Sequence, residues 1–238
     1  IYNSSSNAYE TAYEEVFQNF SVNVYNDIKG FKHTLIKVLE IMPEGKIFFL
    51  VDDIIVTRNF DGAELEKLDL RKEVFSLRLG QSLNYCYMLS TSQPLPRDFV
   101  RDPTSYQANW LWSKGSYDWA YPLSVDGHAF CKDEMEVMIR ALNFKAPNSF
   151  EEKLQKFKSI YLKTRGGCFK ESVIFNNPCN MVQVELVENK SGNLDPVQLL
   201  HHWEEGFEID LSDFEGLRNR GVHLSLIHIS EPTRLGMI

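Results

Sequence analysis

The segment Lys46-Ile47-Phe48-Phe49-Leu50-Val51-Asp52-Asp53 decides the expected fold. Its uninterrupted apolar residues are typical of a strand that is covered on both faces of a sheet. The strand ends in two aspartates, and burying both charges without partners would cost much free energy. We therefore expect a central strand, with Asp52 and Asp53 at its carboxyl end and in reach of a compensating group.

The residues before this strand predict alternating helices and strands. Apolar side chains recur at helical spacing over residues 8–17 and again over 31–42, and residues 22–25 read as a short strand between them. Such an alternation predicts a parallel sheet with right-handed crossovers. Ligands of parallel sheets bind beyond the carboxyl ends of the strands, which is where the aspartate pair stands.

The rest of the chain predicts further helices and strands. Helices are expected at residues 62–70, 133–142, 149–162 and 195–205. Strands are expected at residues 73–79, 83–89, 173–175 and 181–184, and residues 90–122 read as an aromatic-rich loop. Because no clean linker interrupts this pattern, we expect one domain.

Composition excludes some classes of protein. Hydrophobic residues make up 43% of the chain and charged residues 24%, as in ordinary soluble domains. The net charge of −8 argues against a nucleic-acid-binding surface. None of the four cysteines has C-x-x-C spacing, so we expect buried free thiols in a reducing cytosol and not a zinc site.

Both ends of the chain have unusual sequences. Residues 1–3 read like the end of a strand already under way, so we expect the first strand to lie upstream. Residues 224–234 match the translation of a common transposase sequencing adapter. We therefore expect a native domain at residues 1–223 and no native protein at residues 224–238.

The aspartate pair after an apolar strand resembles the acidic "DxD-type" motif of bacterial family-2-like glycosyltransferases with the GT-A fold. The resemblance implies an α/β fold with a mixed, mainly parallel central sheet flanked by helices, Rossmann-like, from which the N-terminal strand is missing. It also implies a Mn²⁺ or Mg²⁺ cofactor bound by Asp53, with Asp52 on the ribose or supporting the metal. A hard cation with oxygen ligands would compensate the paired carboxylates and hold a diphosphate.

Residues 117–130 resemble the glycine-containing loop that lies under the donor sugar and the acceptor in this family. Gly127 would allow a close approach of backbone to ligand. Asp126 and His128 could bind sugar hydroxyls, and Trp119 or Tyr121 could stack on a sugar ring. The alternative is a polar turn whose aromatic side chains only pack as a lid.

Residues 147–154 resemble the family's E-D-x-x-L pattern at the start of a helix, where the general base lies. Matching Leu154 to the leucine of this pattern places Glu151 at the base position. The match is imperfect, because the residue is Glu instead of Asp and Phe150 replaces the first acid. Asp126 is the rival base, and a solvated acid favoured by the helix dipole is the alternative for Glu151.

Further residues are candidates for donor binding. The resemblance places the C-terminal His223 on the metal or the diphosphate, and Asn3 and Ser4 against the nucleotide base or ribose. Lys32 or His33 could face the donor phosphates, although an ordinary surface position is the alternative for each. Arg78 could reach the site, but the sequence does not place it.

The resemblance implies a metal-dependent, inverting glycosyltransferase. It would move a sugar from a nucleotide-diphosphate donor to a hydroxyl of a glycan or lipid-linked acceptor during polysaccharide biosynthesis. It implies a cytoplasmic location and leaves open a peripheral association with the inner face of the membrane. A sugar nucleotidyltransferase of related fold and a non-catalytic carbohydrate- or nucleotide-binding domain are the alternatives.

Overall fold

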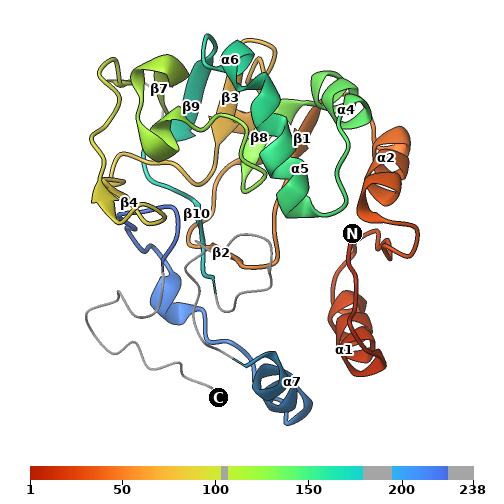
Figure 1. The fold of residues 1–238 in the computed structure, drawn as a ribbon. Coiled ribbons are helices and arrows are strands. Elements are labelled where there is room, and N and C mark those ends of the chain that lie inside the picture. The colour runs from red at the N-terminus through yellow and green to blue at the C-terminus, as the bar shows by residue number, and fades with distance from the viewer. Residues whose placement is uncertain (103–106, 179–194, 225–238) are drawn as a thin grey trace.

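A computed structural model describes residues 1–102, 107–178 and 195–224, and the expected strand at residues 181–184 and the tail at 225–238 lie outside these ranges (Figure 1). The helices are α1 (Asn7–Gln18), α2 (Phe31–Ile41), α3 (Gly62–Glu66), α4 (Lys132–Ala141), α5 (Pro147–Leu154), α6 (Lys158–Tyr161) and α7 (Pro196–Glu204), with 3-10 turns η1 (Trp112–Lys114), η2 (Tyr117–Ala120), η3 (Gln155–Phe157) and η4 (Ser212–Phe214). The strands are β1 (Lys46–Phe48), β2 (Ile54–Val56), β3 (Glu73–Ser76), β4 (Tyr85–Cys86), β5 (Thr91–Ser92), β6 (Val100–Arg101), β7 (Gln107–Leu111), β8 (His128–Cys131), β9 (Arg165–Phe169) and β10 (Ile174–Asn176).

The main sheet is mixed and mostly antiparallel. It has six strands in the order β1-β8-β3-β9-β7-β6, and β2 pairs with β10 in a separate antiparallel ribbon. Within the described ranges, β3 and β9 form the parallel pair of the main sheet, and its other neighbours run antiparallel. The expected α/β class is therefore confirmed, whereas the expected mainly parallel sheet is wrong.

The prediction of parallel order failed because apolar patterning does not specify the partner of a strand. β1 pairs with β8, which lies far along the chain, with Ile47 opposite Phe130. β1 is consequently an edge strand of the described sheet and not its centre. The expected strand at residues 22–25 does not form, and a single parallel bridge joins Tyr2 to Asn26 instead.

The two faces of the main sheet carry two separate hydrophobic clusters. Alternate residues of a strand point to opposite faces, and accordingly Val74 packs in one cluster while its neighbour Phe75 packs in the other. Buried residues of α2, α4, α5 and α6 share the first cluster with Val74. In Figure 1 these helices lie along one side of the sheet, while α3 and the β2–β10 ribbon contribute to the second cluster.

Strands β7 and β9 were not expected from the sequence. The residues of β7 were read as part of the aromatic-rich loop, and two glycines weaken the strand pattern of β9. A Cβ atom on Gly166 would lie 2.5 Å from the ring of Trp110 in β7, so glycine is needed for this contact. Trp110 and Trp119 are completely buried, and the Trp110 indole donates a hydrogen bond of 3.1 Å to the Trp119 carbonyl. The aromatic-rich segment is thus largely core.

Helix α1 lies beside α7 and away from the main sheet (Figure 1). None of its residues is fully buried. Its Tyr13 and Phe17 rings pack with Tyr2, and the Glu15 carboxylate accepts a hydrogen bond of 3.0 Å from the Trp203 indole of α7. The N-terminal and C-terminal segments therefore support one another.

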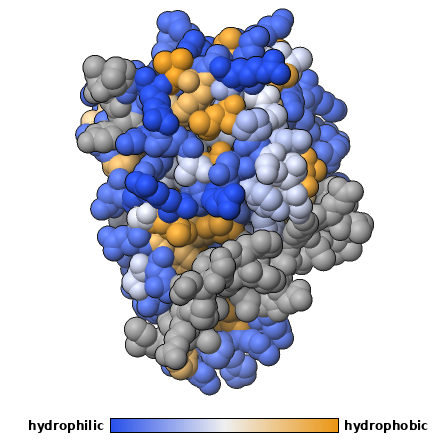
Figure 2. Space-filling view, turned by 90° about the vertical axis from the view of Figure 1, so that its left-hand side faces the viewer, coloured by the Kyte–Doolittle hydropathy of each residue, from blue (hydrophilic) through white to orange (hydrophobic). Residues whose placement is uncertain are grey.

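The face shown in Figure 2 mixes hydrophilic and hydrophobic side chains. The expected peripheral membrane association stays a prediction. No helix among the described residues is long and apolar enough to cross a membrane. Cys86, Cys131 and Cys168 are buried free thiols, as expected, and Cys179 lies outside the described ranges.

Candidate functional site

Arg78 occupies the centre of a group of carboxylates from separate parts of the chain. It follows β3 by two residues, where the Ser76 hydroxyl accepts hydrogen bonds from the backbone amides of Arg78 and Leu79 and so fixes the turn. The residue is only 6% exposed. Its Nη1 atom donates to Asp126 Oδ2 at 2.7 Å and to Ser124 Oγ at 3.0 Å. This pairing compensates a charge that would otherwise be costly to bury.

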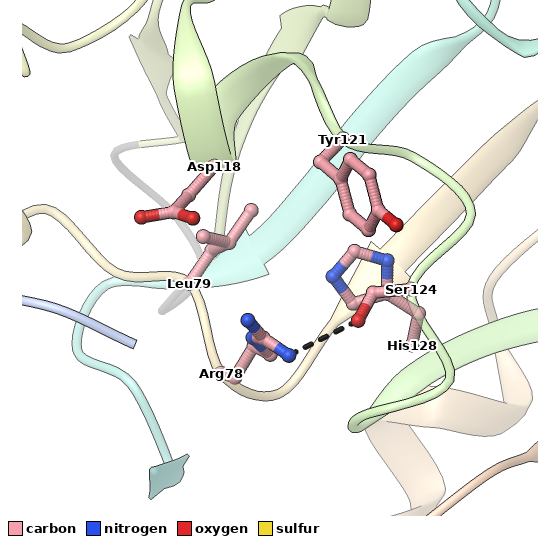
Figure 3. A pocket seen from close by; sticks show the side chains of 6 residues that line it. All are labelled: Arg78, Leu79, Asp118, Tyr121, Ser124 and His128. Atoms are coloured by element: carbon pink, nitrogen blue, oxygen red, sulfur yellow. Dashed lines mark hydrogen bonds between the residues drawn. The ribbon is translucent and has the colours of Figure 1, made fainter. Parts of the chain in front are cut away.

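A small pocket opens beside the Arg78 guanidinium (Figure 3). About 170 Å³ of empty space, part of it open to solvent, lies between the side chains of Arg78, Leu79, Asp118, Tyr121, Ser124 and His128. Figure 3 shows the guanidinium pointing toward the Ser124 hydroxyl, with the Tyr121 phenol and the His128 ring on the same side of the pocket. The cavity volume proper is about 10 Å³, which is about the room that one water molecule needs.

Glu151, at the middle of α5, faces this group of charges. Its pKa is raised to about 7, chiefly because its carboxyl is removed from water and also because the Asp126 charge lies near it. The Arg78 charge and the nearby hydroxyl groups of Ser124 and Tyr121 act in the opposite direction. A carboxyl with a pKa near neutrality can take a proton and release it again at physiological pH.

Asp126 is held in place by its surroundings. Its carboxylate pairs with Arg78, and its backbone amide donates to Ser124 Oγ at 3.2 Å. The Asp126 side chain is 14% exposed. It therefore serves as a fixed negative charge next to Glu151.

Gly127 has a different structural role from the one expected. Its φ of 73° is in the left-handed region, and an added Cβ would lie 2.1 Å from Ile174 Cδ1. Its amide donates to the Phe49 carbonyl at 2.7 Å. The close approach to this glycine is thus made by a side chain of β10, and the glycine lets the loop turn into β8.

Asp53 lies in a second cluster that adjoins the first. Asn176 Nδ2 donates to Asp53 Oδ1 at 2.9 Å, and Asn176 forms a parallel bridge with His223. Burial raises the pKa of Asp53, the charges of Asp126 and Asp52 raise it further, and Asn176 and Arg78 oppose this. The structure therefore brings the predicted residues Asp53 and His223 into one neighbourhood.

His223 has an uncommitted ring nitrogen. Burial, with the Arg78 charge, lowers its pKa to about 3, so the imidazole is neutral. Its Nδ1 atom and the Oδ1 atom of Asn176 are buried and have no hydrogen-bond partner among the described residues. A neutral imidazole nitrogen and an amide oxygen are both able to bind a metal ion.

Asp53 and His223 by themselves make an incomplete set of metal ligands. No group of three or more His, Cys, Asp or Glu side chains in the described ranges is arranged to hold a metal ion. Mg²⁺, however, commonly binds one or two carboxylates together with substrate phosphates and water. Asp53 can provide such a carboxylate. Asp52 beside it is exposed, and its charge contributes to a raised pKa of Tyr13 in α1.

Three predicted donor-binding residues make other contacts or lie at the surface. The Lys32 ammonium donates to the carbonyls of Leu142 and Arg140 at the end of α4. Ser4 Oγ donates to Glu10 Oε2 at 3.0 Å, and the neighbouring Asn3 is exposed. Lys32 thus stabilises the end of a helix, and a role for any of the three in donor binding stays a prediction.

Two aromatic candidates, Trp119 in η2 and His128 at the start of β8, are part of the core. Trp119 is fully buried against Trp110, so the expectation that it stacks on a sugar ring is wrong for this conformation. His128 is buried, and its Nδ1 lies 3.0 Å from the Pro122 carbonyl. Burial lowers the pKa of His128 to about 3, so it lines the pocket as a neutral ring. Tyr121 remains accessible from the pocket.

Sequence reasoning left several residues of the site unplaced or unnoticed. Arg78 is the clearest of them, because an arginine within an apolar run must find a partner when it is buried. The hydroxyl of Ser124 and the amide of Asn176 carry no such signal. Asp118 was also missed; Gln93 Nε2 donates to its Oδ2 at 2.8 Å, and burial raises its pKa.

Comparisons with family models, with curated proteins and with solved structures found no match to this chain.

Proposed function

We propose that this chain is a glycosyltransferase that moves a sugar from a nucleotide-diphosphate donor to a hydroxyl of a glycan or lipid-linked acceptor. One observation carries the proposal. Asp53, Asp126 and Glu151 come from three separate segments, and all three lie within electrostatic reach of Arg78. The resemblance in sequence assigns these acids to one site independently of their proximity in the fold.

Glu151 is the general base in this proposal, with Asp126 as its fixed neighbour. A base works best when its pKa lies near the working pH, and Glu151 meets this requirement. Asp126 is committed to its ion pair with Arg78. Glu151 takes the proton of the acceptor hydroxyl while the acceptor oxygen bonds to the anomeric carbon. The bond from that carbon to the diphosphate oxygen breaks, and its electron pair leaves with the nucleoside diphosphate, so the configuration inverts.

A Mn²⁺ or Mg²⁺ ion bound at Asp53 would neutralise charge on the departing diphosphate. Asn176 orients the Asp53 carboxylate by its hydrogen bond, and His223 offers its free Nδ1 atom in the same neighbourhood. The chain's own contribution is thus one oriented carboxylate in a partly buried setting.

Release of nucleoside diphosphate tests the proposal directly. The protein is incubated with Mn²⁺, a panel of UDP- and GDP-sugars and oligosaccharide acceptors, and both nucleotide and product are measured by mass spectrometry. We expect turnover with one donor, and a loss of about 10²–10⁴-fold in the Glu151→Gln variant. Glu152→Gln changes the exposed neighbouring acid in the same way and is the matched control. No nucleotide release from any donor by a folded protein would contradict the proposal, and pyrophosphate release from a nucleoside triphosphate with a sugar phosphate would identify a nucleotidyltransferase.

A further inference from the structure

His128 brings an unprotonated ring nitrogen to the pocket beside Arg78. Its side chain is buried, with 2% of the residue exposed, and its Nδ1 atom lies 3.0 Å from the Pro122 carbonyl oxygen. Because a carbonyl oxygen can only accept a hydrogen bond, Nδ1 carries the proton of this contact. Burial and the Arg78 charge keep the ring neutral, with a pKa of about 3. The other nitrogen, Nε2, therefore has no proton and is a hydrogen-bond acceptor.

This acceptor has no partner within the described ranges. No hydrogen bond joins His128 Nε2 to a described residue, and Figure 3 shows one ring nitrogen of His128 on the side of Arg78 and Leu79. A buried acceptor that stays unpaired costs free energy. A donor that enters the pocket would remove this cost.

Arg78 brings unused donors to the same pocket. Its Nη1 atom donates to Ser124 and Asp126, whereas its Nη2 and Nε atoms donate to none of the described residues. In Figure 3 the rest of the guanidinium faces the Leu79 and Asp118 side of the pocket. The pocket thus offers a donor and an acceptor, and Arg78 and His128 are both more than nine-tenths buried.

The Asp118 carboxylate restricts which group fits between this donor and this acceptor. Gln93 Nε2 donates to Asp118 Oδ2 at 2.8 Å, and the Asp118 backbone amide donates to Gln93 Oε1 at 3.2 Å, which fixes the carboxylate at the pocket wall. Its charge disfavours an anion, and the Arg78 charge disfavours a cation. The cavity of about 10 Å³ has room for about one oxygen atom. A single neutral oxygen that both accepts and donates belongs to a hydroxyl group or to water.

We propose that this pocket is a subsite for one hydroxyl group of a ligand. The hydroxyl oxygen accepts a hydrogen bond from the Arg78 guanidinium, and its proton is donated to His128 Nε2. A water molecule can make the same two bonds, so a ligand hydroxyl can replace water here with little loss. The identity of the ligand as a sugar of the donor or the acceptor rests on the proposed glycosyl transfer, whereas the selection of a hydroxyl rests on the contacts of Arg78 and His128.

Nitrogen-15 NMR of the histidines in the unmodified protein tests the subsite without any turnover. The His128 signals are identified by their absence in His128→Phe or, if that variant does not fold, by substituting the other histidines one at a time. We expect one protonated and one unprotonated ring nitrogen, unchanged between about pH 5 and pH 8. Methyl glycosides of glucose, galactose, mannose and N-acetylglucosamine, and a panel of UDP- and GDP-sugars, are then added one by one. At least one of them should shift the Nε2 signal, and inorganic phosphate should not.

The affinity of the responding sugar is then compared with that of its monodeoxy forms. Loss of the hydroxyl that occupies the subsite should weaken binding about 10-fold or more, because it leaves buried polar groups unpaired. His128→Phe removes the acceptor and should bind the parent sugar and this deoxy form alike. His201→Phe makes the same change at an exposed histidine and should keep the difference.

Three results would overturn the proposal. They are a protonated Nε2 atom, a response to phosphate equal to that of the sugars, and a folded protein whose Nε2 signal responds to none of the sugars, which would leave water as the occupant of the cavity. A protein that responds to a sugar but transfers none would keep the subsite and reject the glycosyltransferase function.

Discussion

Glu151 combines a nearly neutral pKa with an environment of opposing charges, and this has consequences for both rate and stability. As a general base it must be ionised to work. The acid limb of kcat/KM should therefore rise with pH and reach half of its maximum near pH 7. A pH profile of sugar transfer by the unmodified protein measures this. An acid limb near pH 4.5, the value of an ordinary glutamate, would show that another group is the base.

The same carboxyl should make the fold less stable as the pH rises. Because the pKa is raised in the folded state, the folded chain binds more protons than the unfolded chain between about pH 4.5 and pH 7. This contribution to stability is fully present below pH 4.5 and is lost as the pH rises through 7, on the order of 3 kcal/mol. Urea unfolding at pH 5 and pH 8 should show this loss, and Glu151→Gln should lack it. An equal pH dependence in the two proteins would contradict the assigned burial.

We expect the charged side chain of Asp53 to make the fold less stable than an uncharged side chain of the same shape would. Asn at this position can still accept the hydrogen bond from Asn176, and it removes the repulsion from Asp52 and Asp126. Asp53→Asn should therefore raise the free energy of unfolding at pH 7 by on the order of 1 kcal/mol, as is common for functional sites. Urea denaturation measures this change, and a destabilised variant would show that the charge is structural.

The chemistry of single residues was partly readable in the sequence. Three acids of the candidate site were predicted, because an acid after an apolar strand, beside a loop glycine or at the start of a helix can be identified from the sequence alone. They are Asp53, Asp126 and Glu151. Asn176 and Ser124 were not predicted, because an amide or hydroxyl gains its role only from the residue that lies opposite it. Arg78 is an intermediate case. An arginine within an apolar run needs a partner when it is buried, but the sequence does not show which residue the partner is.

At the scale of elements, the tight turn before β8 is fixed by Gly127. Gly127→Ala should combine the cost of a left-handed φ, about 1–2 kcal/mol, with overpacking against Ile174 of about 1–3 kcal/mol. Gly216 also has a positive φ, of 69°, but an added Cβ meets nothing within 4 Å, so Gly216→Ala should show only the first cost. Urea denaturation compares the two variants, and an equal loss of stability in both would show that Ile174 makes way for the added methyl group.

Removal of Ile174 Cδ1 should relieve this overpacking. Ile174→Val deletes the atom that would lie 2.1 Å from a Cβ added at Gly127. The double variant Gly127→Ala with Ile174→Val should therefore be more stable than the sum of the two single changes allows. Strict additivity in urea denaturation would show that strain in the backbone alone explains the cost.

Helices were predicted more accurately than sheet order, for a physical reason. α2, α4 and α5 follow a local spacing of apolar residues that one segment displays by itself. The pairing of β1 with β8 depends on contacts between distant segments, and a continuous apolar strand is compatible with either direction. β9 was missed because its glycines serve the packing of Trp110 and Phe75 and not the strand pattern.

At the scale of the whole molecule, nucleotide binding tests the central claim most directly. The melting temperature is measured with UDP or GDP, each with and without Mn²⁺, and with Mn²⁺ alone as control. At a ligand concentration about 100-fold above Kd, the stabilisation is about 2.7 kcal/mol, which for a chain of this size is a rise of about 5–10 °C. The account predicts such a rise with one of the two nucleotides, only in the presence of Mn²⁺, and its loss in Asp53→Asn. No rise with either nucleotide in a folded protein would contradict it.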